Sequence, residues 1–484
     1  MTIELSNLTF TEQDDVVPAS GVEEILINTG IANTLAGDDI LNGDTGNIDN
    51  TPTPFRPSGI SNTSTLNTNG GNDILTGTSK NLSYDWAEAY GIYNQGTIDT
   101  SDGDDIITGI NQKNVSYYSA GIYNQGTIDT SDGDDIITGI NEKGEPGYFA
   151  GIYQGSLTSI LNTGNGNDII TGINIGSPKG RGIDISSGSV NTGDDNDTIT
   201  GNGYHIGIFH VFSTLNTGNG NDRIIGNSSN HIGIYSVGQI YTGDGNDIIS
   251  GASPSYGIFS NSIIETGEGD DIITSTGFLH NGGVINTGNG DDSIISQGNF
   301  INRGSVYLGE GNDSIIVNGE FSSSQEFSHI IETGDGDDII TSTGVIYNAS
   351  VIDTGNGDDS IIVNSTGNGY GIYNYGVINM GDGNDSIIAA NEGFESPYNG
   401  SGSVFLGEGE DYIKSFGNGE FSGGNGNDTL ELTPGTYTVK RWYTSVIFTK
   451  GNSLMITSEF EQLIAGNTTY DFTSLTRGQT ITVA

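Results

Sequence analysis

The sequence predicts an all-β protein that winds as a parallel β-solenoid, a stack of coils made of short strands. The phrase T-G-x-G-(N/D)-D-x-I returns sixteen times, and its first and last aspartates, Asp39 and Asp428, are 389 residues apart over 15 intervals, or about 26 residues per repeat. Residues 91–111 and 121–141 share the identical sequence GIYNQGTIDTSDGDDIITGIN. Self-similarity at such a period is typical of repeat architectures, in which each repeat contacts its neighbours.

Each repeat contains three segments with the pattern of short strands. An Ile-x-Thr segment such as 264–266 precedes the turn, and an Ile or Leu stands two residues after the aspartate in every copy. A third segment lies upstream, as in GIYNQG or YGIYNYG. Alternating β-branched residues between turn residues indicate strands. We therefore expect about three strands per coil, with Gly at the corners of a flattened or triangular solenoid.

Substitutions between copies predict which side chains face the interior. The Thr of the Ile-x-Thr segment is replaced by Leu308, Met380 and Leu406 in three copies. The middle position holds residues as different as Asn162, Glu265 and Phe405. Because an interior position exchanges Thr with apolar residues, we expect the Thr column to face the core and the middle residue to face solvent.

The composition is strongly acidic and excludes several classes of protein. The 484 residues include 61 Asp and Glu, 13 Lys and Arg and no Cys, which gives a net charge of -48. A polyanion repels nucleic acids and anionic membranes, so neither is expected as a partner. Without Cys there are no disulfides, and no stretch of about 18 apolar residues is present to span a membrane. Only 33% of residues are apolar, so the ordered repeat, rather than composition, argues for a folded chain.

The acidic residues are concentrated in the turns. The five residues ending at each repeat aspartate contain 34 of the 61 acidic residues. Stacked coils would bring these turns about 4.8 Å apart, where each neighbouring pair of charges costs on the order of 1 kcal/mol even in a high dielectric. A divalent cation between successive turns would relieve this repulsion, and calcium suits a mixed cage of carboxylate and carbonyl oxygens better than magnesium does. The alternative is that each Asp only caps its own turn by accepting backbone N–H bonds.

At the turns the sequence resembles the RTX family, whose haemolysin-type calcium-binding repeat is G-G-x-G-x-D-x-U-x. Residues 423–430, GGNGNDTL, match it in full, and most other copies replace the first Gly by Thr. The resemblance covers residues 31–432 and implies bound calcium ions as the cofactor. Arrays of that family repeat every nine residues and place turns on both edges, whereas here the turn occurs once per coil, so we expect calcium on one edge only.

The turns expected to bind calcium are those with intact Gly and Asp positions. The predicted ligand-bearing aspartates are Asp168, Asp197, Asp222, Asp247, Asp271, Asp292, Asp313, Asp338, Asp359, Asp385, Asp411 and Asp428, and the predicted turn glycines are Gly243, Gly245, Gly267, Gly269, Gly288, Gly290, Gly334, Gly336, Gly355, Gly357, Gly424 and Gly426. The second Gly is replaced in the turns that end at Asp39, Asp73, Asp105 and Asp135, by Leu35, Asn69, Ser101 and Ser131, and Asp195 replaces the third Gly before Asp197. Calcium binding is expected to be weaker or absent in these five turns, and whether the turns that end at Asp39, Asp73, Asp105 and Asp135 bind calcium at all is left open.

The chain is expected to have three parts, an N-terminal cap at 1–30, the solenoid at 31–432 and a C-terminal cap at 433–484. Residues 436–463 alternate like antiparallel strands around a turn at 450–453, and such a cap would protect an open sheet edge. The resemblance implies a secreted or surface-associated structural protein exported from its C-terminal region, which agrees with an N-terminus that lacks the pattern of a signal peptide. No enzymatic activity is expected, and the oligomeric state is open.

The sequence favours three other functions less than a calcium-binding structural role. A β-helix enzyme acting on polysaccharide needs a cluster of basic and acidic groups, but His205, His210, His231, His280 and His329 show no catalytic spacing, and Lys179, Arg181, Arg223 and Arg303 are scattered. Ice binding is less favoured because the outward column is mixed in residue type, and a cytolytic toxin would need a membrane-active segment, which the sequence lacks.

One aromatic residue recurs in the upstream segment of the repeats. This aromatic column consists of Tyr93, Tyr123, Tyr153, Phe209, Tyr235, Phe259 and Tyr373. It is expected to form a stack, or a carbohydrate-binding strip if it faces outward, so a polysaccharide partner stays open.

Overall fold

The structure, a computed structural model, describes residues 2–18, 23–46, 58–80, 88–112, 118–142, 148–175, 177–323, 329–365, 371–389, 394–395 and 402–484. Contacts divide the chain into two compact units. The first unit comprises Met1–Gly267 with Ser275–Gly277, and the second comprises Glu268–Thr274 with Phe278–Ala484.

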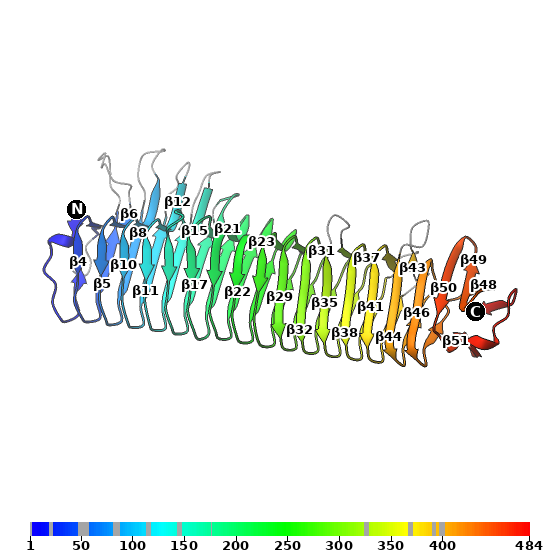
Figure 1. The fold of residues 1–484 in the computed structure, drawn as a ribbon. Coiled ribbons are helices and arrows are strands. Elements are labelled where there is room, and N and C mark those ends of the chain that lie inside the picture. Colours follow the sequence, from blue (N-terminus) through cyan, green and yellow to red (C-terminus); the bar gives the residue numbers. More distant parts are fainter. Residues whose placement is uncertain are drawn as a thin grey trace. The chain divides into compact units, whose positions relative to one another are not determined.

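The first unit is a parallel solenoid with two sheets, here called sheet A and sheet B (Figure 1). Sheet A receives two strands from most coils and contains β1 (Thr2–Glu4), β3 (Ile25–Asn28), β4 (Ile31–Asn33), β6 (Ser58–Asn62), β7 (Thr65–Asn67), β9 (Ala89–Asn94), β10 (Thr97–Asp99), β12 (Tyr118–Asn124), β13 (Thr127–Asp129), β15 (Tyr148–Gln154), β16 (Ile160–Asn162), β18 (Arg181–Ile185), β19 (Ser189–Asn191), β21 (Ile206–Asn216), β23 (Ile232–Tyr241), β25 (Tyr256–Ser260) and β26 (Ile263–Glu265). Sheet B receives one strand per coil and contains β2 (Val16–Val17), β5 (Ile40–Asp44), β8 (Ile74–Ser79), β11 (Ile106–Asn111), β14 (Ile136–Asn141), β17 (Ile169–Asn174), β20 (Thr198–Gly203), β22 (Arg223–Ser228) and β24 (Ile248–Ala252). The prediction of three strands per coil is confirmed by coils such as β9, β10 and β11.

The second unit repeats this arrangement and ends in antiparallel strands. Its sheet A strands are β28 (Phe278–Asn281), β29 (Val284–Asn289), β31 (Phe300–Asn302), β32 (Ser305–Glu310), β34 (Phe321–Ser323), β35 (Ile330–Asp335), β37 (Ile346–Asn348), β38 (Val351–Asn356), β40 (Ile372–Asn374), β41 (Val377–Asp382), β43 (Phe394–Glu395), β44 (Ser403–Gly409), β46 (Gly419–Gly426), β48 (Gly435–Trp442), β49 (Ser445–Lys450), β50 (Ser453–Ser458) and β53 (Thr480–Val483). Its sheet B strands are β27 (Ile272–Ser275), β30 (Ser293–Ser296), β33 (Ser314–Val317), β36 (Ile339–Ser342), β39 (Ser360–Val363), β42 (Ser386–Ala389), β45 (Tyr412–Lys414), β47 (Thr429–Glu431), β51 (Gln462–Ala465) and β52 (Thr468–Asp471).

The C-terminal strands follow the predicted antiparallel pattern. Strand β49 pairs antiparallel with β48 and with β50, and the β49–β50 turn joins Lys450 to Ser453 as expected. Strand β50 also pairs in parallel with β46, and β51 pairs in parallel with β47. The last solenoid coil is therefore extended by parallel pairing before the antiparallel strands cover it.

The core confirms the predicted inside and outside positions. Inward Ile and Leu from the sheets, such as Ile92, Ile98 and Ile107 in one coil, are fully buried. Thr242 and Thr266 of the Thr column are buried, whereas Glu265 between Ile264 and Thr266 is exposed. Many inward Thr hydroxyls donate to the carbonyl oxygen of the Thr in the next coil, as Thr242 Oγ1 does to Thr266 at 3.3 Å. These bonds let a polar hydroxyl sit in an otherwise apolar column.

Parallel pairing begins earlier than the expected boundary at residue 30. Strand β1 pairs with β3, and β2 pairs with β5, both in parallel. Residues 2–18 of the segment assigned to an N-terminal cap thus form a first coil, which includes the 3-10 helix η1 (Leu5–Asn7). A second 3-10 helix, η2 (Phe472–Ser474), lies in the C-terminal segment. Neither of the helices in the described ranges has the length or hydropathy needed to cross a bilayer.

Candidate metal centre

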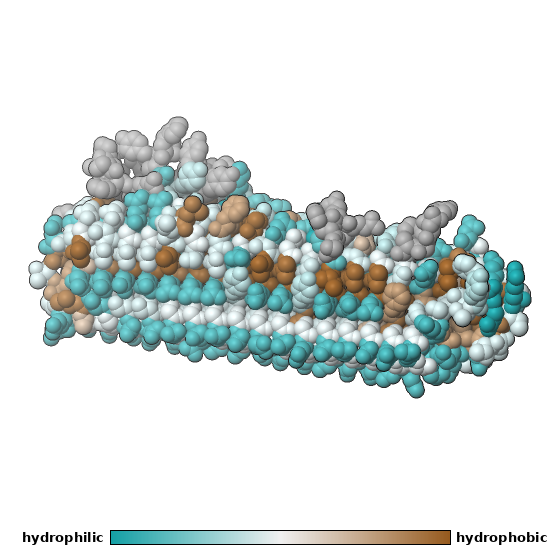
Figure 2. All heavy atoms as spheres, in the orientation of Figure 1, coloured by the Kyte–Doolittle hydropathy of each residue, from teal (hydrophilic) through white to brown (hydrophobic). Residues whose placement is uncertain are grey.

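The acidic turns join sheet A to sheet B on the lower edge of each unit in Figure 1, and that edge is hydrophilic in Figure 2. Both turn glycines have positive φ, for example 86° at Gly243 and 136° at Gly245. A Cβ on Gly245 would lie 1.8 Å from the carbonyl oxygen of Gly220 in the preceding coil. Gly is therefore required at position 245 for two reasons, the positive φ and the close approach of stacked turns.

The degenerate turns keep the same backbone conformation without Gly. Leu35 has a φ of 73°, Ser101 and Ser131 have φ values of 61° and 60°, and Asp195 has 88°. A left-handed conformation is unfavourable for residues with a Cβ. The turn geometry in these coils is thus imposed by the stack around it, and it does not depend on Gly alone.

The repeat aspartates form a buried ladder within each unit. All sixteen are 0–1% exposed, and in the fourteen that follow the first of each unit Oδ1 accepts a hydrogen bond from the backbone N–H of the repeat aspartate in the preceding coil. Asp197 N donates to Asp222 Oδ1, and Asp313 N donates to Asp338 Oδ1, at 2.8 and 2.7 Å. The ladder runs through Asp39, Asp73, Asp105, Asp135, Asp168, Asp197, Asp222 and Asp247 in the first unit and through Asp271, Asp292, Asp313, Asp338, Asp359, Asp385, Asp411 and Asp428 in the second. The side chain thus caps the neighbouring turn and not its own.

The second carboxylate oxygen of these aspartates has a different environment. In fourteen of the sixteen, Oδ2 is buried and makes no hydrogen bond with the described residues; these are Asp39, Asp73, Asp105, Asp135, Asp168, Asp197, Asp222, Asp292, Asp313, Asp338, Asp359, Asp385, Asp411 and Asp428. The inward Thr of the same coil lies near the carboxyl, but its hydroxyl often donates elsewhere, as Thr192 Oγ1 does to Thr217 at 3.3 Å. A buried oxygen of this kind lacks compensation for the loss of water.

Burial also changes the acidity of the ladder. The pKa of Asp313 and Asp385 is raised to about 8: loss of solvation raises it most, neighbouring aspartates add to the rise, and the N–H bond from the adjacent coil opposes it. Burial likewise raises the pKa of Asp73 and Asp292 to about 7, although their Thr neighbours lower it. Ionising the whole ladder at neutral pH without a counter-ion is therefore unfavourable.

A second ladder runs beside the first on the outside of the turn. The residue before each repeat aspartate is exposed and is a mixture of Asn and Asp, with Glu410 in one copy. Its Oδ1 accepts from the backbone N–H of the same position in the following coil; Asn221 N donates to Asn196 Oδ1 at 2.8 Å, and Asp337 N donates to Asn312 Oδ1 at 2.9 Å. The two ladders therefore have opposite polarity along the stack.

The predicted metal-site residues are brought together as columns. Gly218, Gly243 and Gly267 stack on one another, and so do Gly334, Gly355 and Gly381. No group of three or more His, Asp or Glu side chains in the described ranges converges as a ready-made metal cluster. A cation at these turns would therefore need backbone carbonyls besides carboxylates, which is a donor set that suits calcium.

Both ends of the ladder use residues outside the sixteen repeats. Asp15 N donates to Asp39 Oδ1 at 2.8 Å, and Asp428 N donates to Glu461 Oε2 at 2.9 Å. Sequence reasoning missed both residues because neither lies in a Gly-x-Gly turn. The only signal is local, since Asp15 and Glu461 each stand one residue before a short strand of sheet B, β2 and β51.

Two further side-chain groups are visible only in the folded chain. His205 and His231 are 26 residues apart in sequence, yet their rings stack with centroids 4.7 Å apart. Arg181 forms an ion pair with Asp184 at 2.5 Å, and its guanidinium lies 3.5 Å from the ring centroid of Phe209. Arg181 was expected to be an isolated basic residue; the signal for its partner is that Asp184 interrupts the predicted aromatic column.

Comparisons with known proteins add little to this picture. No family model matches the chain, and no curated protein matches it. Among solved structures, the X-ray crystal structure of a hyperactive, Ca2+-dependent, β-helical antifreeze protein from an Antarctic bacterium is similar to this chain, with 19% identity over 78% of this chain and 84% of that one and a TM-score of 0.30. At this TM-score we draw no argument from it.

Proposed function

We propose that this protein is a calcium-binding structural repeat protein of RTX type, in which calcium held at the acidic turns drives folding of the solenoid. The observation that carries the proposal is the column of buried carboxylates whose Oδ2 atoms have no hydrogen-bond partner among the described residues. A buried carboxylate needs a counter-charge or a proton. Oxygen ligands from stacked turns fit calcium.

The contrast between the two ladders supports a cation over a simple cap. The exposed ladder accepts a backbone N–H bond with either Asn or Asp, so an amide oxygen is sufficient for that role. The buried ladder accepts the same kind of bond, yet it is Asp in all sixteen copies. An Asn would keep the Oδ1 bond and lose only the second carboxylate oxygen. The requirement for Asp is therefore explained by what Oδ2 binds.

The proposed working environment follows from ion linkage. A ligand that binds only the folded state stabilises it in proportion to the logarithm of its concentration. The net charge of -48 opposes compaction when calcium is scarce. We therefore place the folded protein outside the cell, where calcium reaches millimolar levels, as a stiff structural or surface-associated module with no catalytic step.

The experiment is a calcium titration of chelator-treated protein at pH 7.5. Far-UV circular dichroism should show β-structure appearing cooperatively with calcium, and atomic emission should count several ions per chain, whereas equal magnesium should restore much less structure. A chain that keeps full β-structure and an unchanged melting temperature in excess chelator at pH 7.5 would refute the proposal. Such a result would leave a solenoid held by protonated aspartates.

A further inference from the structure

The outer face of sheet A in the first unit carries a column of aromatic side chains. Tyr93, Tyr123 and Tyr153 occupy the same register on neighbouring strands, followed by Asp184 and Phe209. The rings of Tyr93 and Tyr123 stack with centroids 5.5 Å apart, and those of Tyr123 and Tyr153 lie 5.0 Å apart. These side chains point away from the core Ile column, so the predicted stack exists on the outer face of the sheet, where Tyr93 and Tyr123 are only 6% and 8% exposed and Tyr153 is partly buried.

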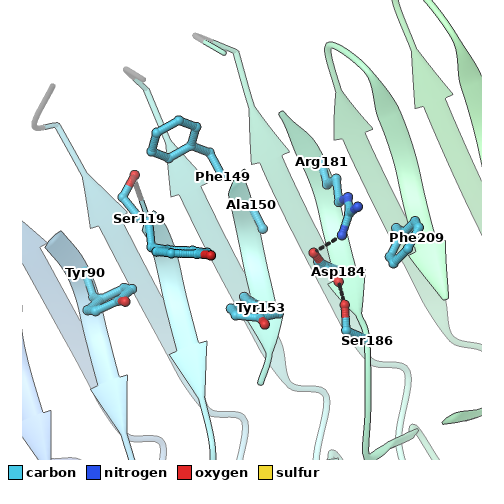
Figure 3. Close-up of a pocket in the computed structure, with 10 residues that line it drawn as sticks. Tyr90, Ser119, Phe149, Ala150, Tyr153, Arg181, Asp184, Ser186 and Phe209 are labelled. Carbon is cyan, nitrogen blue, oxygen red and sulfur yellow. Dashed lines mark hydrogen bonds and ion pairs between the residues drawn. The ribbon is translucent and has the colours of Figure 1, made fainter. Parts of the chain in front are cut away.

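Asp184 interrupts this aromatic column, and a cavity lies at the interruption. The cavity has a volume of about 320 Å³, and its lining includes Phe149, Tyr153, Arg181, Asp184, Ser186 and Phe209. Figure 3 shows Tyr153, Asp184 and Phe209 side by side, with Arg181 reaching over Asp184. Tyr153 and Phe209 are two coils apart, which corresponds to about 9.6 Å, but Asp184 and the Arg181 guanidinium, 3.5 Å from the Phe209 ring centroid, occupy this interval. The open space of the cavity therefore extends over the neighbouring residues Ser119, Phe149 and Ala150.

The floor of the cavity is polar and nearly neutral. Arg181 Nη1 lies 2.5 Å from Asp184 Oδ2, and the two side chains are only 16% and 7% exposed. Ser186 donates to the other oxygen of Asp184. Burial raises the pKa of Asp184, and the charge of Arg181 opposes this. Because the two charges offset each other, the cavity offers hydrogen-bonding groups without a net charge for an ionic ligand.

We propose that this cavity binds a neutral hexopyranose unit of a polysaccharide, with one face of the sugar against Tyr153 and its hydroxyls toward Arg181, Asp184 and Ser186. A sugar ring has an apolar C–H face that packs on an aromatic ring and hydroxyls at its edge that need polar partners. The cavity supplies both, and its volume is at the lower end of the range of ligand pockets, roughly 300–1,000 Å³. The net charge of -48 repels uronic acids, so the ligand is neutral.

Tyr153 contributes both packing and a hydroxyl. Burial, with the nearby Asp184 charge, raises the pKa of its phenol to about 12, so the group is neutral under ordinary conditions and can donate or accept a hydrogen bond. Arg181 lies flat over Phe209 at 3.5 Å, which holds the guanidinium in a fixed orientation. The guanidinium is thus held in place before a ligand binds, which lowers the entropic cost of binding.

The test uses calcium-saturated, full-length protein and isothermal titration calorimetry. Cellohexaose, mannohexaose and β-1,4-galactohexaose serve as neutral probes, and hexagalacturonate serves as the charged one. We expect at least one neutral hexasaccharide to bind and to perturb the tyrosine absorbance of the unchanged protein. Tyr153→Ala should weaken that binding roughly tenfold, the effect of losing one aromatic contact and its hydroxyl, and Tyr153→Phe should weaken it less.

The matched control is Tyr347→Ala in the second unit. Tyr347 also stacks on a tyrosine, Tyr373, at 4.8 Å, but it lines no part of the cavity, so binding should be unchanged. The proposal is wrong if none of the three neutral hexasaccharides binds, or if Tyr153→Ala and Tyr347→Ala bind equally well. It is also wrong if hexagalacturonate, or the small phenol p-cresol, binds more tightly than every neutral sugar. None of these outcomes bears on calcium, which is kept saturating.

Discussion

The buried aspartate ladder and the exposed ladder beside it make the same kind of hydrogen bond, yet they follow different sequence rules. Both connect a side-chain Oδ1 to a backbone N–H of an adjacent coil, as at Asp222 and Asn196. Asn and Asp interchange in the exposed ladder because water solvates the side-chain atom that takes no part in the hydrogen bond. The buried ladder is Asp throughout, so its second oxygen has a role that the hydrogen-bond pattern alone does not explain.

The strongest way to separate the ladders is to remove calcium and vary pH. Burial raises the pKa of Asp222 and Asp338 to about 6 and that of Asp313 to about 8 in the folded state, against 3.8 for an ordinary Asp. The folded state therefore holds protons that the unfolded state releases, and stability is highest below about pH 4 and falls as pH rises through 6 to 8. In chelator, the melting temperature should be much higher at pH 5 than at pH 8.

With calcium saturating, this dependence should reverse, because protons compete with the cation for the carboxylates. Differential scanning calorimetry from pH 4 to 8, with and without calcium, measures both curves. Parallel curves would show that calcium does not act on the buried ladder.

A single amide substitution is the next largest test. Asp222→Asn keeps the Oδ1 acceptor for Asp197 N and removes the carboxylate charge. With calcium we expect fewer bound ions and a loss of about 1–3 kcal/mol of stability. In chelator at pH 7.5 the same change should be neutral or stabilising, since it removes a buried like charge.

The matched control for Asp222→Asn is Asn221→Asp on the exposed ladder, one residue away. It should change stability by less than about 0.5 kcal/mol in either condition. Chemical denaturation of the three proteins gives the comparison. Equal losses in calcium and in chelator would mean that Asp222 acts only through its hydrogen bond.

The turn backbone offers a comparison between intact and degenerate coils. A Cβ at Gly220, which has a φ of 144°, would lie 1.9 Å from the carbonyl oxygen of Asp195. Gly220→Ala should therefore cost about 1–3 kcal/mol. Ser131→Gly, at a φ of 60°, should change stability by only about 1 kcal/mol or less. Thermal melts in calcium measure both; a harmless Gly220→Ala would show that the turns separate easily.

The smallest effect is expected in the Thr column of the core. Thr266 is buried, and the same column holds Leu308, Met380 and Leu406, all buried as well. Thr266→Val should therefore change stability by less than about 1 kcal/mol, and Glu265→Val next to it should lower solubility instead. A large loss at Thr266 would mean that its hydroxyl is essential to the stack.

Much of the fold could be predicted because the sixteen copies of the repeat have the same kind of residue at equivalent positions. Sixteen aligned copies show which positions accept Leu or Met and which accept Glu or Phe, and alternation along a strand then assigns inside and outside. The once-per-coil turn also predicted that the repeat aspartates form a column. The residues at the ends, Asp15 and Glu461, escaped because the terminal coils lack the motif.

The sequence by itself determined the solenoid, its three strands per coil, the acidic column and the antiparallel C-terminal strands, because each depends on local alternation and on spacing that repeats. Only the tertiary structure decided which atoms meet between coils. The carboxylate of each repeat aspartate caps its neighbour's turn, and Arg181 meets Asp184 in a break of the aromatic column. Such contacts depend on the register between coils 17 to 34 residues apart, and side-chain direction across that register is set by packing and not by any local pattern.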